Sequence, residues 1–202
     1  MGLREQHRLD TRRRIADAAF ALAQSTSEVR PDAIAERAGI SRRTLFNYVP
    51  SADAALSLPV EDYLEDAIER FRERPADEDV FTAFVEAVSS IDASVVLRLE
   101  RFVTLQQRHP DEAGARHYLL VWEHSEMRVR EALAERLGKR ADPLFVAALA
   151  GALMGAGKAA VSMWAALPRR PSEHRSKRPP LTSIFVRTLE YLAQTPLRQR
   201  AR

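Results

Sequence analysis

Residues 41–48, with the sequence SRRTLFNY, bring side chains that can recognise DNA together on a short stretch of chain. Arginine can form paired hydrogen bonds with guanine, asparagine can do so with adenine, and an aromatic ring can contact a thymine methyl group. Serine, threonine and tyrosine hydroxyls suit phosphate oxygens, which fix the register of a protein on the duplex without identifying its sequence. Because a major groove accepts an α-helix, this segment predicts a helix that binds there.

The apolar residues of the segment indicate which side chains face outward. With Leu45 and Val49 buried, the residues expected to face bases are Arg42, Arg43, Phe46 and Asn47. The expected phosphate contacts are Ser41, Thr44 and Tyr48. An ordinary solvated helix is the alternative interpretation, but exposed aromatic residues on an arginine-bearing face argue against it.

Shorter apolar patterns on either side predict the helices that hold this one in place. A second helix is expected after Pro31, a residue suited to the first helical position, and it should end at Gly39, where a left-handed backbone costs little. Ser41 is the expected N-cap of the next helix, residues 42–49, and Ser51 caps a fourth helix that continues to about Leu56. Together with a first helix, these elements are about the minimum for a helix-turn-helix.

The first helix is expected over residues 10–24, with Asp10 as its N-cap. Its apolar face follows the i, i+3, i+4, i+7 spacing and consists of Ile15, Ala18, Ala19 and Leu22. Basic residues are dense around its start: Arg4, Arg8, Arg12, Arg13 and Arg14. Such an arm can reach the minor groove or flanking phosphates, although a solvated run of charge is the alternative.

The run "RRRIADAAFALAQ…IAERAGISRRTLFNYVPSADAAL" resembles the N-terminal DNA-binding domain of the TetR-type (tetracycline-repressor-like) transcriptional regulators over residues 12–56. The resemblance implies a two-domain, all-α regulator whose second domain binds a small effector and forms a homodimer. It also implies that residues 42–48 are the recognition helix, with the same base and phosphate contacts.

The chain departs from the family pattern at the edges of this domain. Ala52 stands where the family usually has a phosphate-binding lysine, and Arg30 stands where it usually has a threonine cap. The loss of one lysine contact should weaken DNA binding, and it should make the slope of the logarithm of the binding constant against the logarithm of the salt concentration shallower by about one unit. Arg30 is therefore included among the expected phosphate contacts. The usual glycine after the first helix is replaced by "STS" at residues 25–27.

Residues 57–202 are expected to form a larger helical domain after a DNA-binding domain of residues 1–56. Nearly every apolar stretch has helical period and alternating β-branched runs are absent, which predicts an all-α fold class. Helices are expected near residues 60–74, 78–91, 93–108, 111–138, 142–167 and 181–195, with breaks that include one at Pro59. The basic, proline-rich run over residues 168–180 predicts a loop.

The stretch from 143 to 167 carries a single charged residue, Lys158, and many alanines and glycines. A membrane span is disfavoured, because these small residues offer little apolar area and the lysine would lie deep in the hydrocarbon. An apolar helix of this kind otherwise suits a core or a subunit contact. The resemblance implies that it pairs with residues 181–195 at a dimer face: Leu149, Leu153, Gly155, Ile184, Phe185, Leu189 and Leu192.

The helices between are expected to enclose an effector, and large apolar residues are plentiful there. The expected pocket residues are Phe84, Val88, Phe102, Leu105, Tyr118, Trp122 and Met127, with ordinary core packing as the alternative for each. The stretch "RVREALAERLG" after "VWEHSE" resembles a subgroup of actinobacterial TetR-type regulators, some of which respond to acyl-CoA thioesters. The expected effector is therefore an apolar or acyl-CoA-like small molecule.

Other classes of protein find little support in the composition. The absence of cysteine excludes a disulfide scaffold and a thiolate zinc site, and no metalloprotease, phosphate-loop or nucleophile-elbow motif occurs. His117 and His124 lack an intervening ligand, so neither a metal, a cofactor nor an enzyme is expected. The N-terminus has no apolar signal region, which indicates a cytoplasmic protein. Two alternatives remain open: a ligand-independent architectural DNA binder on the same fold, and a helical protein-interaction module.

Overall fold

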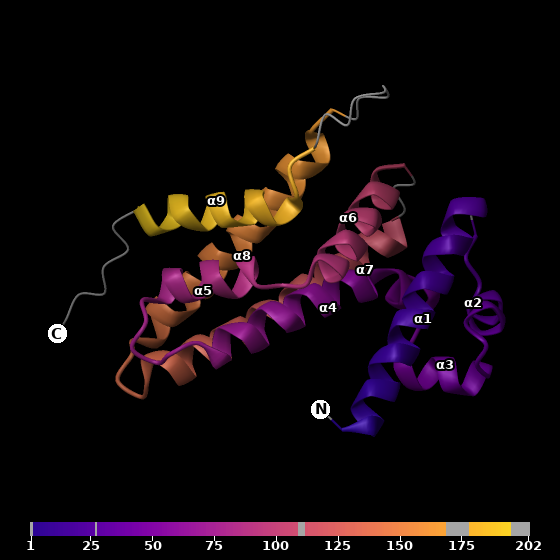
Figure 1. The fold of residues 1–202 in the computed structure, drawn as a ribbon, viewed down its shortest axis with the longest axis horizontal. Coiled ribbons are helices and arrows are strands. Elements are labelled where there is room, and N and C mark those ends of the chain that lie inside the picture. The colour runs from indigo at the N-terminus through magenta and orange to yellow at the C-terminus, as the bar shows by residue number, and fades with distance from the viewer. Residues whose placement is uncertain (1, 27, 109–111, 169–177, 195–202) are drawn as a thin grey trace. The chain divides into compact units, whose positions relative to one another are not determined.

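The structure is a computed structural model that describes residues 2–26, 28–108, 112–168 and 178–194. Every regular element in these ranges is an α-helix, which confirms the predicted fold class. In chain order the helices are α1 (Leu3–Ser25), α2 (Pro31–Ala38), α3 (Arg42–Tyr48), α4 (Ala52–Glu73), α5 (Val80–Ser89), α6 (Ala93–Arg108), α7 (Glu112–Leu137), α8 (Pro143–Ala166) and α9 (Leu181–Gln194) (Figure 1). Most of the loop predicted at residues 168–180 lies outside the described residues.

The chain divides into two compact units. The first unit comprises residues 1–62 and 101–121, and the second comprises residues 63–100 and 122–202. Helices α4, α6 and α7 each contribute to both units. The domain boundary expected after residue 56 falls inside α4 and stays a prediction.

Two predicted helix boundaries are wrong. Helix α1 begins at Leu3 rather than at Asp10, so the arginine-rich segment is helical and not an extended arm. Helix α4 continues through Pro59, where a break was expected. A proline well beyond the first turn removes an intrahelical hydrogen bond. Its neighbours Leu58 and Val60 are both buried, and the apolar area they remove from water outweighs that loss.

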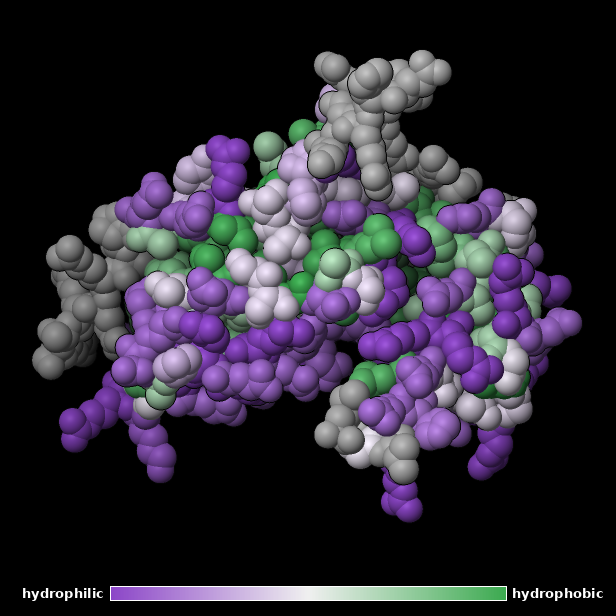
Figure 2. All heavy atoms as spheres, in the orientation of Figure 1, coloured by the Kyte–Doolittle hydropathy of each residue, from purple (hydrophilic) through white to green (hydrophobic). Residues whose placement is uncertain are grey.

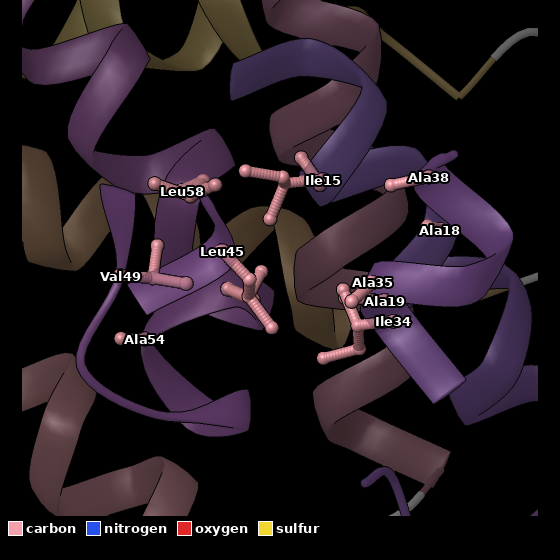
Figure 3. Packing of buried hydrophobic residues seen from close by; sticks show 12 residues of the cluster. Ile15, Ala18, Ala19, Ile34, Ala35, Ala38, Leu45, Val49, Ala54 and Leu58 are labelled. Carbon is pink, nitrogen blue, oxygen red and sulfur yellow. The ribbon is translucent and has the colours of Figure 1, made fainter. Parts of the chain in front are cut away.

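The core of the first unit is formed by small and branched apolar residues of α1 to α4. Ile15, Ile34 and Leu45 are almost fully buried in it (Figure 3). Helix α1 packs against α2, and α2 packs against α3. The many alanines of this cluster allow the short helices to approach closely, so α3 has a rigid support.

Arg12 and Arg14 have structural roles that the sequence did not predict. Arg12 donates hydrogen bonds to Glu61 at 2.6 Å and to Asp62 at 2.5 Å, both near the middle of α4. Burial alone would lower the pKa of Arg12, but the charges of these carboxylates and the hydrogen bonds to them raise it above its ordinary value. Arg14 donates to the carbonyl oxygens of Ala38 and Gly39 at the end of α2.

In the second unit, α9 packs against both α8 and α5. Phe71 of α4 stacks on Phe84 of α5, with their ring centroids 3.9 Å apart. The α9 N-terminus is capped from outside its own sequence, because Glu100 of α6 accepts a hydrogen bond from the Leu181 backbone N–H at 2.9 Å. These contacts order the helices that surround an apolar interior. Figure 2 shows apolar residues reaching the surface beside α9.

Candidate nucleic-acid interface and ligand cavity

The buried and the exposed residues of α3 are those expected from the sequence. Leu45 and, just after the helix, Val49 are buried against the first unit. The four residues expected to face bases are exposed, including Phe46, which is 43% exposed: Arg42, Arg43, Phe46 and Asn47. An exposed phenylalanine that shares a helix face with arginine and asparagine is unusual on a purely solvated helix. The outer face of α3 therefore offers guanidinium, amide and aromatic groups together.

The chain before α3 fixes where this helix begins. Gly39 has φ 64°, a left-handed conformation that ends α2, and its backbone N–H donates to carbonyl oxygens of that helix. Ser41 is the N-cap of α3, since its hydroxyl accepts from the Thr44 backbone N–H at 3.0 Å. The predicted roles of Gly39 and Ser41 in helix termination and capping are both confirmed. The angle between α2 and α3 is thus determined by local backbone chemistry.

The exposed residues of α3 differ in how firmly they are held. Arg42 forms an ion pair with Asp32 of α2, at 3.1 Å, and its guanidinium carbon lies 5.6 Å from the centroid of the Phe46 ring. Within the described ranges, no hydrogen bond or ion pair joins the side chain of Arg43 or Asn47 to another residue. Arg42 is thus oriented by its neighbours, whereas Arg43 and Asn47 retain all of their hydrogen-bonding groups.

The expected phosphate contacts lie around this face. Ser41 and Thr44 share a hydrogen bond between their hydroxyls at 2.7 Å, so these groups partly satisfy one another. Tyr48 is half-buried at the end of α3. Arg30 is exposed, lies 3.7 Å from Glu28, and makes no side-chain cap to α2. Arg30 is therefore accessible to a ligand, while its cation is partly balanced by a carboxylate.

The second unit contains a small, partly open apolar cavity of about 60 Å³. Its walls come from α4, α5, α7, α8 and α9: Tyr63, Leu64, Ala67, Ile68, Phe84, Val88, Trp122, Val129, Leu153, Met154, Gly157, Phe185 and Leu189. None of these side chains is charged. The Lys158 ammonium lies 5.7 Å from the centroid of the Trp122 ring but does not line the cavity.

Three of the expected pocket residues line this cavity: Phe84, Val88 and Trp122. Phe102 and Leu105 are buried in the part of α6 that belongs to the first unit, and Met127 is 51% exposed. The side chain of Tyr118 lies outside the described residues. Tyr63 and Gly157 were not expected here, because neither a tyrosine among acidic residues nor a glycine among alanines is distinctive in sequence.

The expected dimer face is divided between the interior and the surface. Leu149, Leu153, Phe185 and Leu189 are buried within the chain, and the last three line the cavity. Ile184 and Leu192 are half-buried, and Gly155 is exposed. The exposed residues of α8 include Lys158 and Ser162, and also a row of small and apolar residues at helical spacing: Leu144, Ala148, Gly155, Ala159 and Met163. Leu144 is 76% exposed, so this face offers apolar area that the chain itself does not cover.

Helix α8 is also the one described helix long and apolar enough to cross a membrane by length and composition. Of its most apolar window, 44% is buried inside the chain. Helix α8 packs along α9, and Asp142 caps its N-terminus by accepting from the Leu144 backbone N–H at 2.9 Å. These features are typical of a packed helix in a globular domain.

Comparison with known proteins gives a family for the C-terminal part of the chain and a shared fold for nearly all of it. A family model described as the MftR C-terminal domain, one of the TetR-type C-terminal domains, matches residues 74–195. No curated protein matches the chain. The crystal structure of a TetR-family transcriptional regulator from Streptomyces coelicolor superposes with a TM-score of 0.54 at 16% sequence identity, over 96% of this chain and 81% of that one. At this identity the superposition shows that the fold is shared.

Proposed function

The chain belongs to the TetR-type family of transcriptional regulators, and we propose that it is a repressor that binds a palindromic operator as a homodimer and is released by a small-molecule effector. The observation that carries this proposal is the outer face of α3, where Arg43 and Asn47 are exposed on a helix whose inner face is buried. The paired hydrogen bonds of arginine with guanine are the commonest specific contact in the major groove, and asparagine can form such a pair with adenine. We expect a protein with this activity to work in the cytoplasm.

Arg42 and Arg43 have different expected parts in the contact with DNA. The pair between Arg42 and Asp32 leaves further guanidinium N–H groups able to donate, so Arg42 can approach a base or phosphate while its orientation is held. Arg43 has no such restraint and can reorient to a guanine edge. We expect Arg43 and Asn47 to set sequence preference, and Ser41, Thr44, Tyr48 and Arg30 to contribute contacts with phosphates.

The exposed face of α8 supports the homodimer. Its residues are apolar or small over most of the helix, so a second copy could approach closely and cover Leu144 and Met163. Two-fold symmetry would then present two recognition helices to half-sites one helical turn apart. We propose that α8 and α9 contribute this interface, with Gly155, Ile184 and Leu192 at the surface where the sequence placed the dimer face.

The cavity of the second unit supports an effector. It is lined by residues of α4, the helix that also carries part of the first unit, so a ligand there contacts an element shared by both units. A ligand that binds one conformation better than another shifts the population toward it, and a difference of a few kcal/mol suffices. Effector binding therefore favours a conformation in which the two recognition helices no longer match successive grooves.

The test is selection of bound duplexes from a random-sequence library, at physiological salt, by the purified chain. We expect an enriched palindrome, and we expect Arg43→Ala to relax preference at one position of each half-site by about 1–3 kcal/mol. Arg13→Ala is the matched control, because Arg13 is an exposed arginine of the same unit that lies on α1. It should leave the preferred sequence unchanged.

Other outcomes would favour the two alternative functions. If no sequence is enriched, or if no small molecule releases the DNA, a ligand-independent architectural binder becomes the better account. If Arg43→Ala and Arg13→Ala weaken binding equally and neither changes the preferred sequence, only total charge matters, and a protein-interaction module with an acidic partner is favoured. Specific binding should also fall steeply as salt rises.

A further inference from the structure

The cavity of the second unit has a chemical character that restricts what can occupy it. Among its lining side chains, only those of Tyr63 and Trp122 carry a nitrogen or oxygen atom, and both can donate a hydrogen bond. No charged side chain lines the cavity, so a phosphate-bearing head group would find no cation within it. The walls are otherwise aliphatic and aromatic, which favours a neutral, largely apolar ligand.

Tyr63 brings a buried hydroxyl, without a hydrogen-bond partner in the described part of the chain, to the lining of this cavity. It is 2% exposed, and its ring stacks on that of Phe185, with centroids 5.1 Å apart and planes inclined by 19°. Its hydroxyl has no hydrogen-bond partner among the described residues. Buried polar groups are nearly always hydrogen-bonded. Burial, with a further contribution from the charge of Asp66, raises the pKa of Tyr63, so the hydroxyl remains a neutral donor at physiological pH.

Gly157 of α8 lies close to two aromatic rings of the lining. A Cβ atom at this position would lie 3.2 Å from the Trp122 ring and 3.4 Å from the Phe185 ring. The glycine therefore allows the α8 backbone to approach the two aromatic rings that lie beside Tyr63 in the lining. The cavity of about 60 Å³ is smaller than the roughly 150 Å³ that holds benzene, so a ligand must displace part of the wall. Met154, with its flexible side chain, is a suitable part to move.

We propose that the effector of this site is a neutral, mainly apolar molecule, about the size of a substituted benzene, whose single acceptor oxygen receives a hydrogen bond from the Tyr63 hydroxyl. The inference rests on the proposed function, because it names the ligand class of the effector site. Tyr63 is a specificity-determining residue in this account. The aromatic lining provides most of the affinity, and the hydroxyl selects molecules that carry an acceptor.

Two probes of nearly the same shape test this selection. Acetophenone carries a carbonyl oxygen where α-methylstyrene carries a methylene group, so the pair differs mainly in one hydrogen-bond acceptor. Equilibrium dialysis of each probe against the purified full chain measures both affinities. The chain should bind acetophenone about three- to tenfold more tightly, which corresponds to one neutral hydrogen bond. Tyr63→Phe should abolish this preference, chiefly by weakening acetophenone binding.

Matched variants separate selection by Tyr63 from general effects of mutation. Tyr191→Phe removes the hydroxyl of an exposed tyrosine on α9 that interacts with Arg187, so it should retain the preference of the unmodified chain. Gly157→Ala narrows the cavity and should weaken both probes to a similar extent. Tyr63→Phe keeps the stacked ring, and circular dichroism verifies that each variant is folded.

The outcomes are decisive and separable from those for DNA binding. A preference that survives Tyr63→Phe, or that disappears equally in Tyr191→Phe, overturns the assignment of the donor. If the unmodified chain binds neither probe at millimolar concentration, the cavity is not a site for this ligand class. The operator selection needs no probe, so it can succeed while this inference fails, and probe binding can be measured even if no operator is found.

Discussion

Replacing Gly39 by alanine should destabilise the first unit for two separable reasons. Its backbone has φ 64°, where a Cβ atom costs about 1–2 kcal/mol. That Cβ would also lie 2.9 Å from Nη2 of Arg14, which donates to the carbonyl oxygens of Ala38 and Gly39. The guanidinium must then move, and the loss of these partly exposed hydrogen bonds costs about 1 kcal/mol more. We therefore expect Gly39→Ala to cost about 2–3 kcal/mol in total.

A double-mutant cycle separates the two contributions. Arg14→Met keeps most of the aliphatic side chain and removes the guanidinium, so it should itself cost about 1 kcal/mol. In that background Gly39→Ala should cost only the backbone term, about 1–2 kcal/mol. The coupling between the two positions is then about 1 kcal/mol.

Urea unfolding followed by far-UV circular dichroism gives the free energies of unfolding for the four proteins of the cycle. Hydrogen exchange of the α2 and α3 amides verifies that the loss is located in the first unit, because locally weakened segments exchange faster. If Gly39→Ala costs the same with and without the guanidinium, the contact with Arg14 does not contribute. If it costs less than about 0.5 kcal/mol in both backgrounds, the left-handed turn is not a feature of the folded chain.

Two further predictions concern ion pairs elsewhere in the chain. Arg12→Met leaves two carboxylates on α4 without their cation and should lower the free energy of unfolding in urea by about 2–3 kcal/mol. Arg13→Met is the control, because the Arg13 side chain is 51% exposed, and it should lower that free energy by less than about 0.5 kcal/mol. Equal losses would contradict the role of Arg12. The hydrogen bond from Arg74 to Glu78, at 2.8 Å, lowers the pKa of Glu78 in the folded chain below its ordinary value of 4.5. The stability from this pair is therefore fully present above pH 4.5 and is lost as the pH falls through the lowered pKa of Glu78. At pH 7, Glu78→Gln should therefore unfold at a lower temperature than the unmodified chain. The difference between the two unfolding temperatures should shrink as the solution is acidified. A difference that does not depend on pH would refute the contribution of this ion pair.

Much of the recognition helix could be predicted because its determinants are local. Ser41 caps the helix three residues before Thr44, Gly39 supplies a left-handed turn, and Leu45 and Val49 share one face by helical spacing. Each of these relations involves only a few residues of separation. The same reasoning could not exclude an early start of α1, because basic residues there are compatible with both a helix and a flexible arm.

The roles of Arg12 and Arg14 depend on residues far along the chain. Arg12 finds its carboxylates 49 and 50 residues later, and Arg14 finds its carbonyls 24 and 25 residues later. Nothing in the spacing of the five arginines distinguishes Arg12 and Arg14, which hold the fold, from the other three. Likewise, Pro59 reads as a helix break in sequence, and only the burial of its neighbours explains why α4 continues.

The sequence by itself determined the helical class, the helix-turn-helix and the residues exposed on its outer face, because periodicity, capping and backbone conformation act between near neighbours. Tertiary structure decided the rest. Helix α8 is apolar on nearly every face, so its composition could not tell the side that lines a cavity from the side that stays exposed. Packing against α9 turned Leu153 and Gly157 inward and left Leu144 outside, and it placed Tyr63 beside Phe185, more than a hundred residues later in the chain.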